Sequence, residues 1–406
     1  MGNKPRIRFK GFTEDWEQRK LGNLTQLITK GTTPKVKNIQ NGINFIKVEN
    51  ISDDGVISIN SYVSEEEHMN YLSRSILANN DILFSIAGTL GRTAIVKSHL
   101  LPANTNQALA IIRLNKSVDV KYINTFLKSN AIKTYIRKNP TVGAQPNLSL
   151  GQVSDLEINI PNYSEQKKIS NLFSKFDLMI TLHQCKLEKL KLTKKALLQK
   201  LFPKNGEHIP EIRFKGFTDA WEQCKLGVLA EIVRGASPRP ISDPKWFDNN
   251  SNVGWLRIAD VTAQDGRIRY LDQKISELGQ EKTRVIKTPH LLLSIAATVG
   301  KPVINYVPTG VHDGFLIFLN PKFDILYTFW WLEMFREKWN KYGQPGSQVN
   351  LNSDLVKNQV INIPNEKEQE KISSFLEALD KIITLHQRKL ERLQEVKKGL
   401  LQKMFV

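Results

Sequence analysis

The chain has 406 residues, which suits two to four domains, and 40% of them are apolar, enough to bury a sizeable core. No apolar run is long enough to span a membrane, and the first residues lead into no apolar signal segment, so we expect a cytoplasmic protein. The formal net charge of +18 favours a polyanionic partner such as nucleic acid, although surplus solubility or attraction to a membrane surface would give the same charge.

The sequence is internally repeated. Three segments of the first half return in the second half: 8–13 at 213–218, 85–91 at 294–300, and 158–202, without gaps, at 361–405. The stretches between them diverge, and 30–82 resembles little of 234–291. A repeat of about 200 residues is far longer than a solenoid unit. We therefore expect a duplicated domain pair with a pseudo-two-fold relation between its halves.

Each half begins with a module of mixed α/β type. In the first module, apolar runs bounded by turn residues predict strands at 44–48, 81–86 and 108–114. Residues 118–138 carry apolar side chains at helical spacing, and 325–341 is the counterpart in the second module. The aromatic residues of that second helix are predicted to be core rather than a base-stacking platform, because they also follow helical spacing.

A long helix follows each module. Asn162 precedes Glu165 by three residues, and Asn365 precedes Glu368 in the same way. Asparagine is a good helix N-cap, and a glutamate three residues later can bond back to the N–H of the cap. We therefore predict helix starts at both places.

Apolar residues in both long helices alternate at spacings of four and three, which is typical of a coiled coil. The economical arrangement packs the two helices against each other in antiparallel orientation. The histidines of this seam are expected to fix the register, because they have no metal-ligand neighbours at suitable spacing. The predicted seam residues are Ile169, Phe173, Phe176, Ile180, His183, Leu187, Leu190, Ile372, Leu376, Leu379, Ile383, His386, Leu390 and Leu393.

Three pairs of polar loops fall at matched places: 30–37 with 234–240, 88–92 with 297–301, and 143–147 with 346–350. Lys and Arg can contact phosphates, Arg is the commonest residue to bind guanine, and Gln or Asn can pair with adenine. For a single loop a polar-capped turn is an equally good interpretation, but three matched pairs favour DNA contact. The candidate DNA-binding residues are Lys30, Thr32, Thr33, Lys35, Lys37, Thr89, Arg92, Gln145, Asn147, Arg234, Ser237, Arg239, Thr298, Lys301, Gln348 and Asn350.

The sequence contains none of the common catalytic and cofactor-binding motifs. There is no Asn-Pro-Pro-aromatic motif for base methylation, no glycine-rich cofactor loop after a strand, and no phosphate-binding Gly-x-x-x-x-Gly-Lys-Ser/Thr. Metal-binding His-Glu-x-x-His and Cys-x-x-Cys motifs are also missing from the sequence. Cys185 aligns with Arg388 and Cys224 aligns with Arg19, so the two thiols are interpreted as incidental. We predict no catalytic residue, no metal site and no bound cofactor.

The order of variable module, constant helix, variable module and constant helix resembles a known family. Three markers occur in both copies: Asn-Ile-Pro-Asn-x-x-Glu-Gln-x-Lys-Ile-Ser, Thr-Leu-His-Gln-x-Lys-Leu-Glu, and Leu-Leu-Gln-Lys-x-Phe. Together they resemble the specificity subunit of a type I restriction-modification system over essentially the whole chain. The resemblance implies target-recognition domains at 1–161 and 205–364, with a central long helix at 162–204 and a C-terminal one at 365–406.

The resemblance also implies a function. Each recognition domain would bind one half of a split asymmetric DNA site, while the helices set the spacer and dock two modification subunits. Catalysis would lie in partner chains: S-adenosylmethionine on the modification subunits, and ATP and Mg on the restriction subunits that join through them. A non-catalytic coiled-coil scaffold, another sequence-specific DNA-binding protein and a self-sufficient enzyme are the alternatives.

Overall fold

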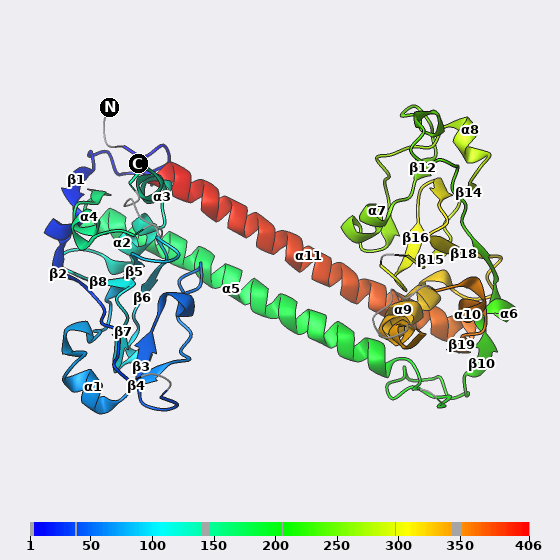
Figure 1. Ribbon diagram of the computed structural model, residues 1–406, viewed down its shortest axis with the longest axis horizontal. Coiled ribbons are helices and arrows are strands. Elements are labelled where there is room, and N and C mark those ends of the chain that lie inside the picture. Colours follow the sequence, from blue (N-terminus) through cyan, green and yellow to red (C-terminus); the bar gives the residue numbers. More distant parts are fainter. Residues whose placement is uncertain are drawn as a thin grey trace. The chain divides into compact units, whose positions relative to one another are not determined.

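The computed structural model describes residues 4–36, 39–139, 147–204, 206–296, 298–342 and 351–405. The chain divides into two compact units (Figure 1): unit 1 is Met1–Cys185 with His386–Val406, and unit 2 is Lys186–Leu385. Each long helix therefore contributes one part to each unit, rather than standing as a segment of its own. Among the described residues, no helix combines the length and the apolar character needed to cross a membrane.

Unit 1 is built on two small sheets. One has four antiparallel strands in the order β2-β8-β5-β6, and the other has the order β4-β3-β7 with β3 and β7 parallel. A separate antiparallel pair, β1 with β9, connects the start of the module to its end. The elements are β1 (Glu17–Lys20), β2 (Thr25–Lys30), β3 (Ile43–Ile46), β4 (Tyr62–Val63), α1 (Glu65–Met69), β5 (Ile82–Ser85), β6 (Thr93–Ile95), β7 (Ala103–Thr105), β8 (Leu109–Leu114), α2 (Val120–Leu127), α3 (Asn130–Lys138), α4 (Leu150–Ser154) and β9 (Glu157–Ile160).

Unit 2 follows a similar plan, with one strand added to its larger sheet and a different third strand in its smaller one, where β14 pairs with β17 whereas β4 of unit 1 pairs with β3. Its larger sheet has the order β11-β18-β15-β16-β13, its smaller sheet β12-β17-β14, and β10 pairs with β19. The added strand β13 runs parallel to β16. The elements are β10 (Glu222–Lys225), α6 (Leu226–Leu229), β11 (Glu231–Arg234), β12 (Gly254–Trp255), α7 (Ile258–Ala263), β13 (Arg267–Ile268), α8 (Glu277–Gln280), β14 (Arg284–Ile286), β15 (Leu291–Ser294), β16 (Pro302–Asn305), β17 (Thr309–Val311), β18 (Phe315–Leu319), α9 (Ile325–Phe335), α10 (Ser353–Lys357) and β19 (Val360–Ile363).

The predicted strands are present, but both module helices are shorter than their apolar pattern suggested. The single helix expected over 118–138 is divided into α2 and α3. The break lies at Ser129, whose backbone is extended (φ −66°, ψ 165°) between the last turn of α2 and the first turn of α3. The helix expected over 325–341 ends at Phe335 and continues as a 3-10 segment, Arg336–Tyr342. Its aromatic residues are buried, as expected for core: Phe329, Trp330, Trp331, Phe335 and Trp339.

The long helices are α5 (Tyr163–Lys200) and α11 (Glu366–Met404). Both predicted caps are confirmed: Asn162 Oδ1 accepts from the backbone N–H of Glu165 at 2.9 Å, and Asn365 Oδ1 from that of Glu368 at 3.0 Å. The two glutamate side chains were expected to bond back to the caps. The structure instead turns both carboxylates toward the beginning of each module.

Glu165 binds two side chains that precede it by about 150 residues. Its carboxylate is fully buried, and it accepts from Arg8 Nε at 2.7 Å and from Arg8 Nη2 at 2.8 Å. Trp16 Nε1 donates to the same carboxylate at 3.3 Å. Unit 2 repeats the arrangement with Glu368, Arg213 and Trp221 at 2.7, 2.8 and 3.2 Å. In each unit this buried ion pair ties the N-terminal arm of the module to the first turn of its long helix.

Within unit 1, the described parts of α5 and α11 run antiparallel. Lys397 forms an ion pair with Asp177, and His183 Nδ1 lies 3.0 Å from His386 Nδ1. From Asp177 to His183 the chain advances along α5, whereas their partners go back along α11 from Lys397 to His386, so the two helices run in opposite directions. Every residue of the predicted seam is buried or half-buried. Lys397, which lies four residues after Leu393 and so continues the seam spacing, pairs with an acidic residue. The two seam histidines lie against each other.

Within unit 2, the remaining parts of the two helices pack in the same way. Lys194 pairs with Asp380, which is the repeat counterpart of the Lys397–Asp177 pair in unit 1. Lys194 Nζ also lies 4.6 Å from the ring centre of Trp330, a cation–π contact. Lys194 continues the seam spacing four residues after Leu190, as Lys397 does after Leu393, and each of these two lysines has an acidic partner.

Each core is completed by the end of a long helix. In unit 1, the ring of Phe405 lies 5.5 Å from Phe126, 5.7 Å from Tyr122 and 5.6 Å from Phe173, centre to centre. In unit 2, the equivalent Phe202 lies 5.4 Å from Tyr327. The last described residues of the chain are therefore part of the hydrophobic core of the first module.

Candidate functional site

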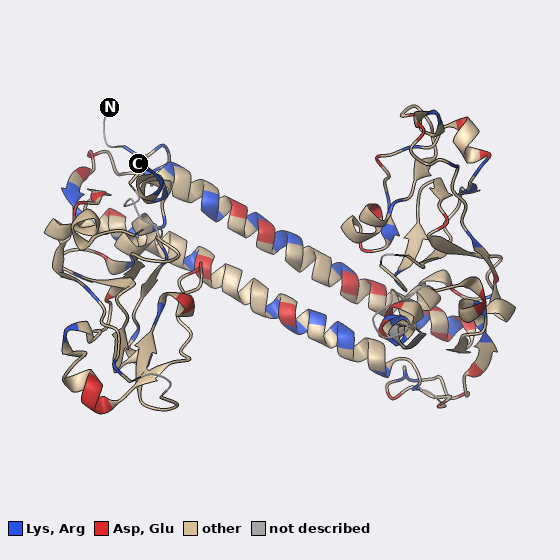
Figure 2. Cartoon of the chain, viewed as in Figure 1, with Lys and Arg blue, Asp and Glu red and all other residues tan. Residues whose placement is uncertain are grey.

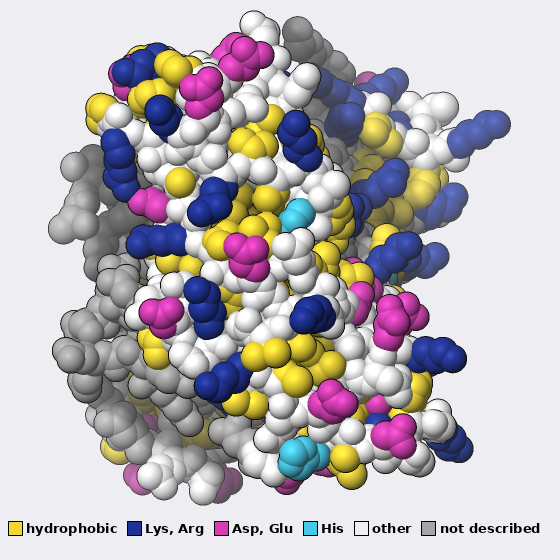
Figure 3. All heavy atoms as spheres, turned by 90° about the vertical axis from the view of Figure 1, so that its right-hand side faces the viewer, with side chains coloured by type: hydrophobic (Ala, Val, Ile, Leu, Met, Phe, Trp, Pro, Cys, Tyr) yellow, Lys and Arg dark blue, Asp and Glu magenta, His cyan; other side chains and the backbone are white. Residues whose placement is uncertain are grey.

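Positive charge alone does not locate a site on this chain. Basic and acidic residues occur together along α5 and α11 (Figure 2). On the face drawn in Figure 3, Lys and Arg side chains are scattered and separated by acidic and apolar ones. Cations near phosphates give affinity without sequence preference. A site that distinguishes sequences is better sought in the loops at the sheet edges.

In unit 1, two of the predicted DNA-contacting loops leave the same edge of the four-stranded sheet. Lys30, the last residue of β2, lies opposite Ala110 in β8, and Ser85, the last residue of β5, lies opposite Leu109. The segments that continue from these strands therefore start side by side. We call this edge the loop edge of unit 1, formed by 31–36, 86–92 and the β7–β8 connection 106–108.

The third predicted loop reaches the same edge through Asn147. This residue forms an isolated bridge with Ala87, and the N–H of Leu148 donates to the carbonyl of Ile86 at 2.8 Å. Gln145 of the same loop and Lys37 of the first one lie outside the described residues.

Unit 2 has an equivalent loop edge. Arg234, the last residue of β11, lies opposite Leu316 in β18, and Ser294, the last residue of β15, lies opposite Phe315. The loop edge of unit 2 is formed by 235–240, 295–296, 298–301 and the β17–β18 connection 312–314. Gln348 and Asn350 of the third predicted loop lie outside the described residues.

In both units a glycine lets the loop that follows the first strand of the larger sheet approach a second connection closely. This is the β7–β8 connection in unit 1 and the β17–β18 connection in unit 2. A Cβ atom on Gly31 would lie 2.1 Å from the carbonyl oxygen of Asn106, and one on Gly235 would lie 2.2 Å from that of His312. Real Cβ atoms do not approach backbone oxygens so closely, so only glycine fits. Backbone hydrogen bonds next to each glycine hold the two segments together. The frame of the loop edge is thus the same in the two units.

The connection opens with a polar residue that caps its own turn. Asn106 Oδ1 accepts from the backbone N–H two residues later at 3.3 Å, and His312 Nδ1 does the same at 2.8 Å. In this geometry Nδ1 of His312 carries a lone pair. Burial lowers the pKa of His312, which also favours the neutral ring. His312 is therefore a structural counterpart of Asn106.

The following residue differs between the units. It is the exposed Gln107 in unit 1 and the half-exposed Asp313 in unit 2. Neither Gln107 nor Asp313 was among the residues predicted from the sequence to contact DNA. Their shared distance from the strand that follows, β8 or β18, is the signal that could have found them.

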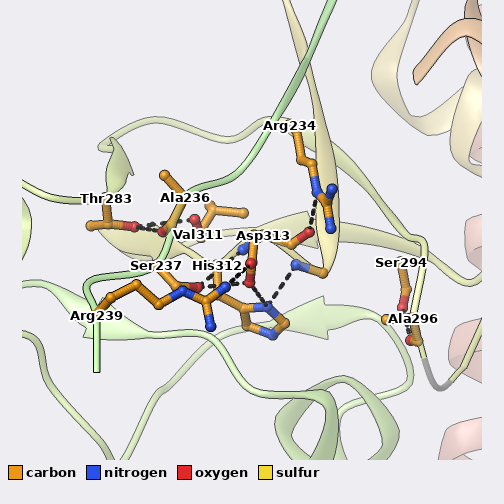
Figure 4. A network of polar contacts seen from close by, with 11 residues as sticks. Arg234, Ala236, Ser237, Arg239, Thr283, Ser294, Ala296, Val311, His312 and Asp313 are labelled. Carbon is orange, nitrogen blue, oxygen red and sulfur yellow. Dashed lines mark hydrogen bonds and ion pairs between the residues drawn. The ribbon is translucent and has the colours of Figure 1, made fainter. Parts of the chain in front are cut away.

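Asp313 is the centre of a polar network at the loop edge of unit 2 (Figure 4). Its Oδ1 accepts from Ser237 Oγ at 2.8 Å, and its Oδ2 lies 2.5 Å from Arg239 Nη2. Arg234 Nε donates to the backbone oxygen of Asp313 at 2.6 Å. Three of the predicted DNA-binding residues of unit 2 therefore converge on Asp313, two on its carboxylate and one on its backbone oxygen.

The network keeps Asp313 ionised. Partial burial by itself raises the pKa of this carboxyl group, but the hydrogen bond from Ser237 and the charges of Arg239 and Arg234 outweigh it, so that the pKa is lowered. The side chain of Arg239 is 71% exposed despite its ion pair. The side chain is thus held through Nη2 and is otherwise largely open to solvent.

A cleft of about 260 Å³ lies beside this network, lined by Arg239, Trp255, Arg257, Ile258, His312 and Asp313 among others. Arg257 also has a carboxylate partner, because its Nη2 and Nε lie 2.9 and 3.0 Å from the two oxygens of Asp260. The cleft is therefore lined by two arginines, each paired with an aspartate, and by the buried Trp255.

The predicted residues of unit 1 occupy the same edge with different contacts. Lys30, Thr33, Lys35 and Thr89 are exposed, and Thr32 is half-buried. The ammonium of Lys35 lies 4.3 Å above the ring centre of Tyr71. Arg92 is half-buried, with its Nε 3.1 Å from Asp53 Oδ1.

Lys301 is a correction to the predicted set. Its side chain is only 10% exposed, and its ammonium lies 2.6 Å from Asp265 and 3.2 Å from Glu333. Both partners are acidic, so the charge is neutralised within unit 2 and is not presented to a phosphate. The Thr298 hydroxyl is also buried. Neither residue contributes a side chain to the exposed part of the loop edge.

Across the described ranges, no cluster of three or more His, Cys, Asp and Glu side chains could hold a metal ion.

The family model for the type I restriction modification DNA specificity domain matches the chain twice, at residues 13–192 and 218–395. The chain belongs to this family. Each match holds one target-recognition domain, with one loop edge in each.

Individual relatives agree with the family assignment. The type I restriction enzyme MjaVIII specificity subunit of Methanocaldococcus jannaschii is 24% identical over 416 residues, covering 96% of this chain and 91% of the relative. The crystal structure of a type I restriction-modification S subunit from M. genitalium superposes with a TM-score of 0.64 at 14% identity, covering 99% of both chains. A chain from a study of complex assembly in a type I system gives a TM-score of 0.58 at 17% identity over 95% of this chain and 96% of that one. The repeated α/β architecture is thus shared with specificity subunits.

Proposed function

We propose that the loop edges are the base-recognising surfaces of the two target-recognition domains, each binding one half of a split asymmetric double-stranded DNA site. The observation that carries the proposal is the combination of an equivalent frame with different side chains. Glycine, backbone hydrogen bonds and turn-capping residues hold the two loop edges in the same way. At equivalent positions, however, unit 1 has Gln107 and Lys35 where unit 2 has Asp313 and Arg239. Side chains that differ on an equivalent frame suit recognition of two different sequences.

The proposed site is tested by assembling the full chain with its modification subunit and sequencing the DNA that the complex has methylated. A single motif of two defined halves with a fixed spacer is expected. Methylation without a defined motif, or the same motif from modification subunits that lack this chain, would reject the proposal. A scaffold without DNA affinity would also lack the steep salt dependence that phosphate contacts impose.

Chemistry is proposed to reside in the partners of this chain. The modification subunits would bind S-adenosylmethionine and methylate adenine, and restriction subunits would join through them, hydrolyse ATP with Mg and cut DNA. Absence of methyl transfer by this chain alone, with activity restored by adding the modification subunit, is the expected result. Methyl transfer by the purified chain alone would instead identify an enzyme.

The helices offer a matched pair of docking positions for the modification subunits. On α5, in unit 1, Met179 is 39% exposed and Leu182 is 59% exposed. Their repeat counterparts on α11, in unit 2, are Ile382 at 43% and Leu385 at 54%. Apolar side chains exposed at the same place in both repeats suit a partner that binds in two copies. We propose that each pair contacts one modification subunit.

Replacing Leu182 by Glu is expected to reduce the complex from two modification subunits per chain to one, because a charge would be buried in an apolar contact. Leu385→Glu should have the same effect at the other position, and the double variant should bind none. Native mass spectrometry of the assembled complex gives the count. Lys189→Gln, at another exposed position of α5, is the control. Two bound subunits in the double variant would contradict the docking proposal.

The paired helices are proposed to set the spacer between the half-sites. Seven residues added between His183 and Gln184, together with seven between Leu385 and His386, preserve the seam because its repeat is seven residues. They add roughly 10 Å of helix, or about three base pairs. Methylated-site sequencing should show a spacer lengthened by about three base pairs, with both half-sites unchanged. An unchanged spacer in an active complex would contradict this role.

A further inference from the structure

We propose that Arg239 is the guanine-contacting residue of unit 2 and that Asp313 is its positioning residue. This inference rests on the proposed function of the loop edge and assigns a base class to one of its side chains. Three observations support it: the position of Arg239 at the loop edge, its ion pair with Asp313, and the different residues at the equivalent positions of unit 1.

Arg239 lies on the first loop of the loop edge, next to the cleft. A guanidinium has five N–H donors, and the ion pair with Asp313 engages one nitrogen, Nη2. With 71% of the side chain exposed, donors remain for a second acceptor. Guanine offers two acceptors, O6 and N7, at the spacing that an arginine fork matches. Of the four bases, guanine is therefore the one this group suits best.

Asp313 holds the arginine in place before DNA arrives. Its carboxylate is itself fixed by Ser237 Oγ at 2.8 Å, and its backbone oxygen by Arg234 Nε at 2.6 Å. An arginine that is already oriented loses less conformational freedom on binding, which favours a well-defined contact over a loose one. Both oxygens of Asp313 are occupied, so the carboxylate itself is poorly placed to accept from a base.

Unit 1 carries different groups at the corresponding places, Lys35 and Gln107. Lysine is a compact charge without the planar fork of arginine, and glutamine matches adenine rather than guanine. Lys35 is also directed onto the ring of Tyr71. The guanine contact is therefore expected in only one half-site, the one bound by unit 2.

The test uses the chain assembled with its modification subunit and a library of DNA sites. Arg239→Ala should lower discrimination at a single G·C pair of one half-site by about 10- to 100-fold, which corresponds to losing one bidentate base contact. The other half-site should stay unchanged. Asp313→Asn, which keeps the shape and removes the charge, should weaken discrimination at the same base pair. Arg239→Lys should fail to restore it.

Arg269→Ala is the matched control. This arginine is exposed in the same unit, stacks 4.8 Å from the ring centre of Tyr306, and follows β13 at the far end of the sheet. It should leave the motif intact. A uniform loss of affinity in Arg239→Ala with an unchanged motif would make Arg239 a phosphate contact and overturn the assignment. A base preference altered by Asp313→Asn but not by Arg239→Ala would overturn it too. If the complex without any substitution shows no split motif, the proposed function itself fails.

Discussion

Replacing Glu165 by Ala is expected to destabilise unit 1 by about 3–5 kcal/mol, the usual effect of removing one partner from a buried ion pair. The carboxylate is fully buried, and the change leaves Arg8, 13% exposed, without the two bonds of 2.7 and 2.8 Å that neutralise it. The indole N–H of Trp16 loses its acceptor as well. Unit 2 has its own pair, Glu368 with Arg213, and should keep its stability.

Hydrogen exchange followed by mass spectrometry in increasing urea separates the two units, because each peptide reports the opening of its own surroundings. Peptides of unit 1 should lose protection in Glu165→Ala, and those of unit 2 in Glu368→Ala. Glu157→Ala removes an exposed carboxylate that accepts from Gln18 at 2.9 Å, and it should change stability by less than about 1 kcal/mol. Equal loss of protection in both units after either buried substitution would contradict the assignment.

Replacing Phe405 by Ala is expected to cost unit 1 about 3–5 kcal/mol, as truncation of a core phenylalanine does elsewhere. Its ring is 7% exposed and packs against Tyr122, Phe126 and Phe173. Phe405 is far from the first module in sequence but lies in its core. A change at the end of the chain should weaken the module that begins it, and leave the module immediately before the last helix unaffected.

The same exchange experiment measures this effect, and the repeat supplies the reciprocal variant. Phe202→Ala should weaken unit 2, where the ring contacts Tyr327. Leu182→Ala, at a position 59% exposed on α5, removes a comparable side chain from the surface and should have little effect on either unit. If Phe405→Ala lowered the protection of unit 2 rather than unit 1, the division of the chain into these units would be wrong.

Features of the fold that depend on neighbours in sequence were predictable. The helix caps at Asn162 and Asn365 and the heptad seam follow from side chains within a few residues of each other, which is the range over which sequence patterns act. The strands of the modules were placed for the same reason. The break at Ser129 was missed because the apolar pattern continues across it, while the backbone of this one residue is extended rather than helical.

Partnerships across long stretches of sequence were not predictable from patterns. Glu165 looked like half of a capping box, and its use by Arg8 becomes visible only when the N-terminal arm is folded against the helix. Lys301 looked like an exposed loop cation, but Asp265 and Glu333 neutralise it from 36 and 32 residues away. Asp313 pairs with Arg239, which lies 74 residues earlier in the sequence. This pairing within the candidate site could therefore be found only from the structure.

The placement of residues 386–406 in unit 1 has a consequence for synthesis on the ribosome. Domains usually fold in the order in which they emerge, the N-terminal one first. Here unit 2 is one continuous segment, Lys186–Leu385, whereas unit 1 needs Met404 and Phe405 to fill its core. The core of the first module therefore stays incompletely packed until residues 404 and 405 have been made. The module that is translated first is thus expected to be the last to reach its final stability, and in the meantime to be the more exposed to proteases and chaperones.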